Sequence, residues 1–148
     1  MPKRSERSFK IPVRSVAAVQ AQNYLRKAES HLASALEASI AERWDTAVLL
    51  GVHAVISAAD AVCVATAGVR SVSPAHTDQT RLIRDLFPDD SGAKKAVDQL
   101  AAVLDRKNTV EYEARRCTTD DAEIVTKQAE RVLGWARQVC GRAPLRGV

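Results

Sequence analysis

The segment 106–113 gathers side chains that can hold a phosphate ester and move a proton. Arg106 falls on the same helical face as Val103 and Val110, so its aliphatic stem should point inward or along a cleft, and its guanidinium is a candidate anion ligand. Glu111 is a candidate base and Tyr112 a candidate proton donor. The candidate catalytic residues are Arg106, Asn108, Glu111 and Tyr112, with Lys107 as a further binding residue. The alternative is an ion pair of Arg106 or Lys107 with Asp60, beside a solvated charged face.

A second polar group, His53, Ser57 and Asp60, has the i, i+4, i+7 spacing that places residues on one helical face. Its composition is that of a hydrolytic triad. However, residues stacked along one helix need not converge as nucleophile, base and orienting acid must, and no glycine-bounded turn presents the serine. We therefore expect a hydrogen-bonded polar stripe in which Asp60 pairs with an arginine or lysine of another helix, while His53 and Asp60 stay candidate binding residues.

His76 lies in a predicted loop, where it is a candidate for proton transfer or binding. The alternative is the start of a helix, with a capping residue and an i, i+3 charge pair between Asp78 and Arg81. His31, on the first predicted helix, is interpreted as a surface residue.

Cofactor motifs are absent from the sequence. It contains neither G-x-x-x-x-G-K nor G-x-G-x-x-G, and no H-E-x-x-H spacing. The three cysteines, Cys63, Cys117 and Cys140, are widely spaced, so neither a disulfide framework nor a zinc site is indicated. We expect no cofactor and no metal, and a reducing cytoplasm as the compartment.

The composition predicts one all-α domain. The 148 residues are 46% hydrophobic and only 4% aromatic, with six glycines and five prolines, which is too few turn residues for an all-β chain. Residues 1–14 carry five basic side chains against one acidic one, so the net charge of +4 belongs to this segment. We expect a basic tail over 1–14, one domain over 15–141 and a second tail over 142–148.

The predicted architecture is an antiparallel four-helix bundle with an extra short helix. The first helix, 15–40, is expected to bury one stripe of apolar residues at three-to-four spacing: Ala21, Leu25, Ala28, Leu32, Leu36 and Ile40. The second begins at an Asp45 cap and stops at Gly68; the later helices cover 78–87, a stretch following Gly92, and 118–141.

The second predicted helix is apolar on nearly every side. Asp60 near the middle of 47–68 makes insertion costly, so we expect a buried central helix and disfavour a membrane span. Four of its apolar residues point in directions too different to face one neighbouring helix: Leu49, Val55, Ile56 and Val62. A second copy of the chain would cover the apolar surface left over, so we expect a homodimer.

The order of these features resembles the HEPN domain, an all-α bundle of prokaryotic toxin–antitoxin and phage-defence systems and of nucleotidyltransferase partners. The resemblance covers about residues 20–141. It rests on Tyr24, Ala28 and Leu32, on the segments 44–47 and 53–61, on His76 and on the segment 106–112.

Active members of that family carry an arginine followed after four to six residues by a histidine, which form a metal-independent ribonuclease site across a dimer. The resemblance implies that Arg106 holds the scissile phosphate and Asn108 is the polar residue. The histidine position falls on Glu111 or Tyr112, and neither has the balanced acid and base forms of imidazole at neutral pH.

Two hypotheses follow from this departure. The first is a catalytically degenerate, dimeric interaction module that binds a partner protein or RNA, for example a nucleotidyltransferase-like or other defence protein. The second is a divergent metal-independent ribonuclease toxin in which Arg106 acts with Glu111, Tyr112 or His76. A membrane-surface role for the basic tail is a third alternative.

Overall fold

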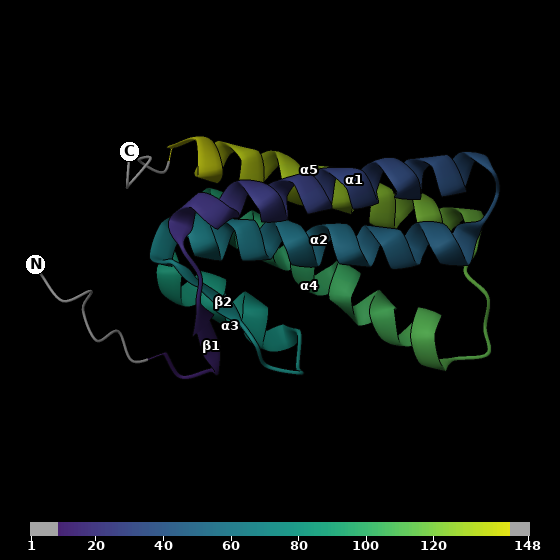
Figure 1. Ribbon diagram of the computed structural model, residues 1–148. Coiled ribbons are helices and arrows are strands. Elements are labelled where there is room, and N and C mark those ends of the chain that lie inside the picture. Colours follow the sequence, from purple (N-terminus) through teal and green to yellow (C-terminus); the bar gives the residue numbers. More distant parts are fainter. Residues whose placement is uncertain (1–8, 143–148) are drawn as a thin grey trace, which may run out of the picture.

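The computed structural model describes residues 9–142 as an all-α bundle (Figure 1). Its elements, in chain order, are β1 (Val13–Ser15), the 3₁₀ turn η1 (Ala18–Gln20), α1 (Ala21–Ile40), α2 (Trp44–Ala67), β2 (Val69–Ser71), α3 (Thr77–Leu86), α4 (Ser91–Tyr112) and α5 (Thr119–Arg142). Four helices are long and α3 is short, as the sequence predicts. Along the bundle, α1 and α4 run one way while α2 and α5 run the other.

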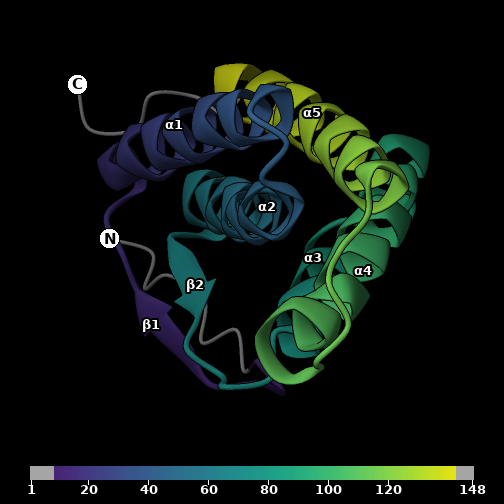
Figure 2. The same ribbon diagram turned by 90° about the vertical axis from the view of Figure 1, so that its right-hand side faces the viewer.

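Helix α2 is the centre of the molecule. Figure 2, a view along the bundle, shows it surrounded by the other helices and by the small sheet, and it packs against α1, α3, α4, α5 and β2. By length and composition alone α2 is apolar enough to cross a membrane, but 72% of its most apolar stretch is buried inside the bundle. The prediction of a buried central helix is confirmed.

The central position of α2 removes one argument for a dimer. Val55 and Val62 are 1% and 0% exposed within the single chain, and Leu49 and Ile56 are half-buried. Val55 and Val62 need no second copy to cover them, because neighbours on several sides of α2 do so, and the homodimer stays a prediction.

The buried stripe of α1 differs from the prediction at its C-terminal end. The buried residues end with Leu32, Ala35 and Ala38, whereas Leu36 is 37% exposed and Ile40 is 85% exposed. Each step of four residues turns the side chain by about 400°, a drift of about 40° from one face. Successive steps of four from Leu32 therefore carry Leu36 and Ile40 out of the interface.

The start of α2 also differs from the prediction. The helix begins at Trp44 after Arg43, and no side chain caps it. Asp45 lies in the first turn, and its carboxylate instead accepts a hydrogen bond from the backbone N–H of Cys117, at 2.7 Å. The predicted stop is confirmed, since Gly68 adopts the left-handed conformation (φ 65°) that ends many helices.

A two-stranded antiparallel sheet joins the N-terminal segment to the bundle. Val13, Arg14 and Ser15 of β1 face Ser71, Arg70 and Val69 of β2. Ile11, just before β1, is only 8% exposed and belongs to the core. Residues 9–14, expected in the basic tail, are thus part of the folded unit; residues 1–8 and the tail from 143 lie outside the described residues.

Helices α3, α4 and α5 start and end within a few residues of their predicted limits. Asp90 caps α4 by accepting the backbone N–H of Ala93 at 3.0 Å, as a short polar residue before a helix commonly does. The segment 105–112, for which the sequence leaves helix or frayed chain open, continues α4 without a break to Tyr112. This continuity sets the directions of all candidate catalytic side chains on α4.

Candidate functional site

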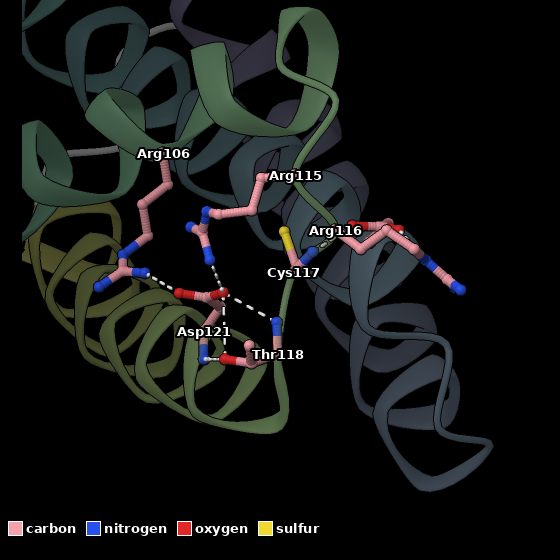
Figure 3. A network of polar contacts seen from close by, with 7 residues as sticks. Arg106, Arg115, Arg116, Cys117, Thr118 and Asp121 are labelled. Carbon is pink, nitrogen blue, oxygen red and sulfur yellow. Dashed lines mark hydrogen bonds and ion pairs between the residues drawn. The ribbon is translucent and has the colours of Figure 1, made fainter.

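Arg106 is held by an acidic residue of the neighbouring helix. Its Nη1 atom lies 2.6 Å from Oδ1 of Asp121, near the start of α5, and its side chain is 31% exposed. The predicted inward direction is confirmed, but the expected partner Asp60 was wrong. Figure 3 shows the guanidinium of Arg106 directed at Asp121.

Asp121 is the centre of a polar network where the loop after α4 enters α5 (Figure 3). Besides Arg106, its carboxylate meets Nη1 of Arg115 at 3.3 Å and accepts the backbone N–H of Thr118 at 2.8 Å. The hydroxyl of Thr118 in turn accepts the backbone N–H of Asp121 at 3.3 Å, which is the reciprocal arrangement of a capping box. The Thr118 hydrogen bond, together with those from its hydroxyl and from Arg106, lowers the pKa of Asp121, so it is a permanent anion facing Arg106 at neutral pH.

Asp45 anchors the same loop to the central helix. Besides the N–H of Cys117, it meets Nε of Arg116 at 3.4 Å, and the Cys117 hydrogen bond is the main reason that its pKa is lowered. The loop between α4 and α5 is thereby tied to α2 and to α5, and this fixes the position of Arg106.

Glu111 forms an ion pair with its own helix. Its Oε2 atom lies 3.0 Å from Nζ of Lys107, one turn earlier on α4, and the hydrogen bond from Lys107 lowers the pKa of Glu111. A carboxylate with a lowered pKa is a weaker base. Asn108 is exposed, and Tyr112 is 76% exposed at the end of the helix.

Helical geometry separates Arg106 from its proposed partners. At about 100° per residue, Glu111 lies about 140° and Tyr112 about 120° around the α4 axis from Arg106. Neither side chain is on the face that Arg106 shares with Val103. Within one chain, the arginine and the two residues at the histidine position therefore point in different directions.

His76 lies in the electrostatic environment of Lys107 and Glu111. Burial lowers the pKa of His76, the charge of Lys107 and that of His53 lower it further, and Glu111 opposes them. The predicted helix start is confirmed, since His76 immediately precedes α3, although the His76 side chain makes no capping hydrogen bond. The predicted ion pair between Arg81 and Asp78 is present, at 3.6 Å.

His53 is exposed on α2 and its ring lies 5.6 Å, centroid to centroid, from that of His31. His31 is half-buried rather than fully on the surface, and burial is the main cause of its lowered pKa. His53 therefore lies between His31 of α1 and the C-terminal part of α4, and its charge acts on both His76 and Glu111.

Asp60 belongs to a separate buried cluster. Gln79 of α3 donates an N–H to its Oδ1 atom at 2.8 Å, and Nε of Arg70 in β2 lies 3.6 Å from its Oδ2 atom. Burial raises the pKa of Asp60 to about 6, against the opposing charge of Arg70. The predicted pairing with a cation is confirmed, but the cation comes from a strand and not from Arg106 or Lys107.

Several functional neighbours were not anticipated from the sequence. The Thr118–Asp121 spacing signals a capped helix start, and it gives no sign that Asp121 also binds Arg106. Arg70 lies in a strand of three residues, too short for a periodic pattern to mark it. Gln79 shares the buried face of α3 with Leu82 and Ile83, and this i, i+3, i+4 spacing is the signal that could have found it. Within residues 9–142, no three His, Cys, Asp or Glu side chains gather closely enough to hold a metal ion.

Comparison with known proteins assigns the chain to a family. No curated protein matches it at a significant level. The family model described as the HEPN domain matches residues 21–139, which covers α1 to α5 and includes the whole Arg106 segment. With most of its residues matched and an all-α bundle as its fold, the chain belongs to the HEPN domain family.

Proposed function

We propose that this chain is a catalytically degenerate HEPN module that acts by binding, as a homodimer and with a partner protein or RNA. The observation that carries the proposal is the 2.6 Å ion pair between Arg106 and Asp121 within one chain. An arginine neutralised by a carboxylate with a lowered pKa must break a charge-assisted hydrogen bond before it grips a phosphate.

The state of the residues at the histidine position supports the same proposal. Glu111 is engaged by Lys107, and both Glu111 and Tyr112 lie well around the helix from Arg106. A ribonuclease of the family type needs a phosphate ligand and a proton-transfer group at one reacting centre. The proposed setting is a prokaryotic, cytoplasmic toxin–antitoxin or defence system, with a nucleotidyltransferase-like or other defence protein as partner.

One observation favours the second candidate, a divergent metal-independent ribonuclease. The charges of Lys107 and Glu111 are close enough to His76 to alter its pKa, although burial is the larger cause of its lowered pKa. An imidazole beside a lysine is a pair that can transfer a proton and hold an anion. In this candidate His76 replaces the missing histidine and Lys107 contributes to phosphate binding.

RNA cleavage in EDTA separates the two candidates. Purified protein is compared with Arg106→Ala, Tyr112→Phe and His76→Ala, and with Arg131→Ala, an exposed arginine of α5, as the matched control for lost positive charge. The binding module predicts no cleavage above the level of Arg106→Ala for any of these proteins. Cleavage by the wild type and Arg131→Ala that is lost in Arg106→Ala and His76→Ala would overturn it in favour of the ribonuclease.

Light scattering on the same samples tests the dimer. The proposal expects twice the chain mass of 16.1 kDa at micromolar concentration. A mass of one chain at every concentration tested would contradict the homodimer and leave a partner protein as the route to assembly.

A further inference from the structure

A small hollow of about 210 Å³ lies between the C-terminal half of α2, the strand β2 with the segment after it, and the start of α3. Figures 1 and 2 show β2 and α3 on the side of α2 that faces away from α1. Asp60, Arg70 and Gln79 line the hollow with charged and amide groups, and Ile56 and Val72 line it with apolar surface. The buried Asp60 cluster is therefore part of the wall of this hollow.

The side-chain amide of Gln79 has an acceptor without a partner. Gln79 is only 3% exposed, and its Nε2 atom donates to the backbone carbonyl of Ile56 at 3.0 Å and to Oδ1 of Asp60 at 2.8 Å. These two bonds fix the orientation of the amide, because turning it over would set its oxygen against two other acceptors. The buried Oε1 atom has no hydrogen-bond partner among the described residues, whereas buried polar atoms normally have one.

The Nε–H group of Arg70 is a donor without a partner in the same cluster. Nε lies 3.6 Å from Oδ2 of Asp60, which is close enough for an ion pair and too long for a hydrogen bond. The Tyr24 ring, whose centre is 5.8 Å from Cζ, helps to hold the guanidinium in place. Nε is buried and has no hydrogen-bond partner within residues 9–142. One free donor and one free acceptor thus flank the carboxylate of Asp60.

The charges around the hollow balance each other. Among the described residues that line it, only Asp60 and Arg70 are charged at neutral pH, and they are of opposite sign. His76 also lines the hollow, and burial lowers its pKa from 6.5, so its ring is neutral above pH 7. A neutral ligand with an acceptor and a donor side by side would satisfy both free groups and would bring no unpaired charge into a buried site.

We propose that this hollow binds a small neutral amide, whose carbonyl oxygen accepts the Nε–H of Arg70 and whose N–H donates to Oε1 of Gln79. A carboxamide carries an acceptor and a donor on one planar group and does not titrate near neutral pH. Ile56 and Val72 would contact a short aliphatic part of the ligand. The hollow is smaller than the range of about 300–1,000 Å³ that is typical of sites for drug-sized ligands, so the ligand has only a few carbon atoms. The inference goes beyond the proposed function, because the Arg106 network supplies none of these groups.

Two isomeric amides test the hydrogen-bond pattern. Butyramide and N,N-dimethylacetamide have the same formula and the same kind of carbonyl acceptor, but only butyramide has an N–H donor. Each is titrated into ¹⁵N-labelled protein at pH 7.5, above the pKa of Asp60 of about 6. ¹H–¹⁵N NMR follows the Nε–H signal of Arg70, the side-chain N–H signals of Gln79 and the backbone N–H signal of Val72.

Two leucine variants test the site itself. Gln79→Leu removes the free acceptor at nearly constant volume. Gln99→Leu on α4 is the matched control, because the side-chain oxygen of Gln99 is also buried without a partner in the described part of the chain, and Gln99 does not belong to the described lining of the hollow. Thermal unfolding checks that both variants are folded.

We expect butyramide to bind the wild type and Gln99→Leu saturably at millimolar concentration, and to bind Gln79→Leu at least about fivefold more weakly, since its N–H would lose the acceptor. N,N-dimethylacetamide should bind the wild type at least about fivefold more weakly than butyramide does. Signal shifts that do not saturate, equal binding of the two isomers, or equal binding of butyramide by the two leucine variants would overturn the proposal. If Gln79→Leu unfolds, the comparison of the isomers on the wild type, with the identity of the shifted signals, decides the outcome.

Discussion

At Gly51, the backbone of α2 lies against the side chain of Val125 on α5. A Cβ atom added at Gly51 would lie 2.5 Å from Cγ1 of Val125, roughly 1 Å nearer than favourable carbon contacts, which lie at about 3.5–4.0 Å. Val125 is fully buried, and a β-branched side chain in a helix has essentially one rotamer. It cannot turn away, so Gly51→Ala must push the two helices apart.

Two opposing contributions set the change in the free energy of unfolding that Gly51→Ala causes. Overpacking a close interface costs about 1–3 kcal/mol, whereas alanine in place of glycine inside a helix returns about 1 kcal/mol. Gly134 of α5 is the matched control, because a Cβ added there meets nothing within 4 Å. Gly134→Ala should stabilise by about 0.5–1 kcal/mol, so the difference between the two variants is the overpacking cost, about 1–3 kcal/mol.

Urea unfolding followed by circular dichroism at 222 nm measures both changes as free energies of unfolding. We expect Gly51→Ala to lower the free energy relative to Gly134→Ala, and Val125→Ala to remove that penalty when combined with Gly51→Ala. Equal stabilisation by the two glycine substitutions would refute the reasoning, since it would mean that α2 and α5 are not in close contact at Gly51.

Three further predictions concern the polar clusters and the α1–α2 turn. Asp121→Asn removes the negative charge that holds Arg106 and weakens the cap of α5; we expect a loss of about 1–3 kcal/mol in urea unfolding and no RNA cleavage, so cleavage by this variant would contradict the degenerate site. Because burial raises the pKa of Asp60 from 3.8 to about 6, the folded protein binds more protons than the unfolded chain between these values, and stability should fall by about 3 kcal/mol as pH rises through that window and then level off. Asp60→Asn should flatten this part of the profile, and an unchanged slope would assign it to other groups. Glu42 has a φ of 61°, a left-handed conformation that glycine adopts without strain. We therefore expect Glu42→Gly to raise the free energy of unfolding by up to about 1 kcal/mol, measured as a higher thermal midpoint; a lower midpoint would show that the Glu42 side chain offsets its strained backbone.

The direction of Arg106 was predictable and its partner was not. Its spacing from Val103 and Val110 places it on the inner face of any continuous helix. Its partner Asp121 is on the next helix, 15 residues later, at a position set by the intervening loop and by the anchor of that loop to Asp45. No periodic pattern encodes where a loop delivers the first turn of the following helix.

The same distinction holds for Asp60. A carboxylate in the middle of an apolar helix must find a cation or a hydrogen-bond donor, so its pairing was predictable from the sequence. Arg70 lies in a strand of only three residues, which is too short to show alternation. The identity of the partner therefore depends on β2 folding back beside α2.

The sequence by itself determined the number, order and approximate limits of the helices, the burial of α2 and the departure from the family's histidine motif, because these depend on local periodicity, on Gly68 and Asp90, and on residue identity. Tertiary structure alone decided that Arg106 is neutralised by Asp121, that His76 comes close to Lys107 and Glu111, and that Asp60 is paired with Arg70. These contacts join residues far apart in the chain, and they form only when packing of the helices and the small sheet brings those residues together.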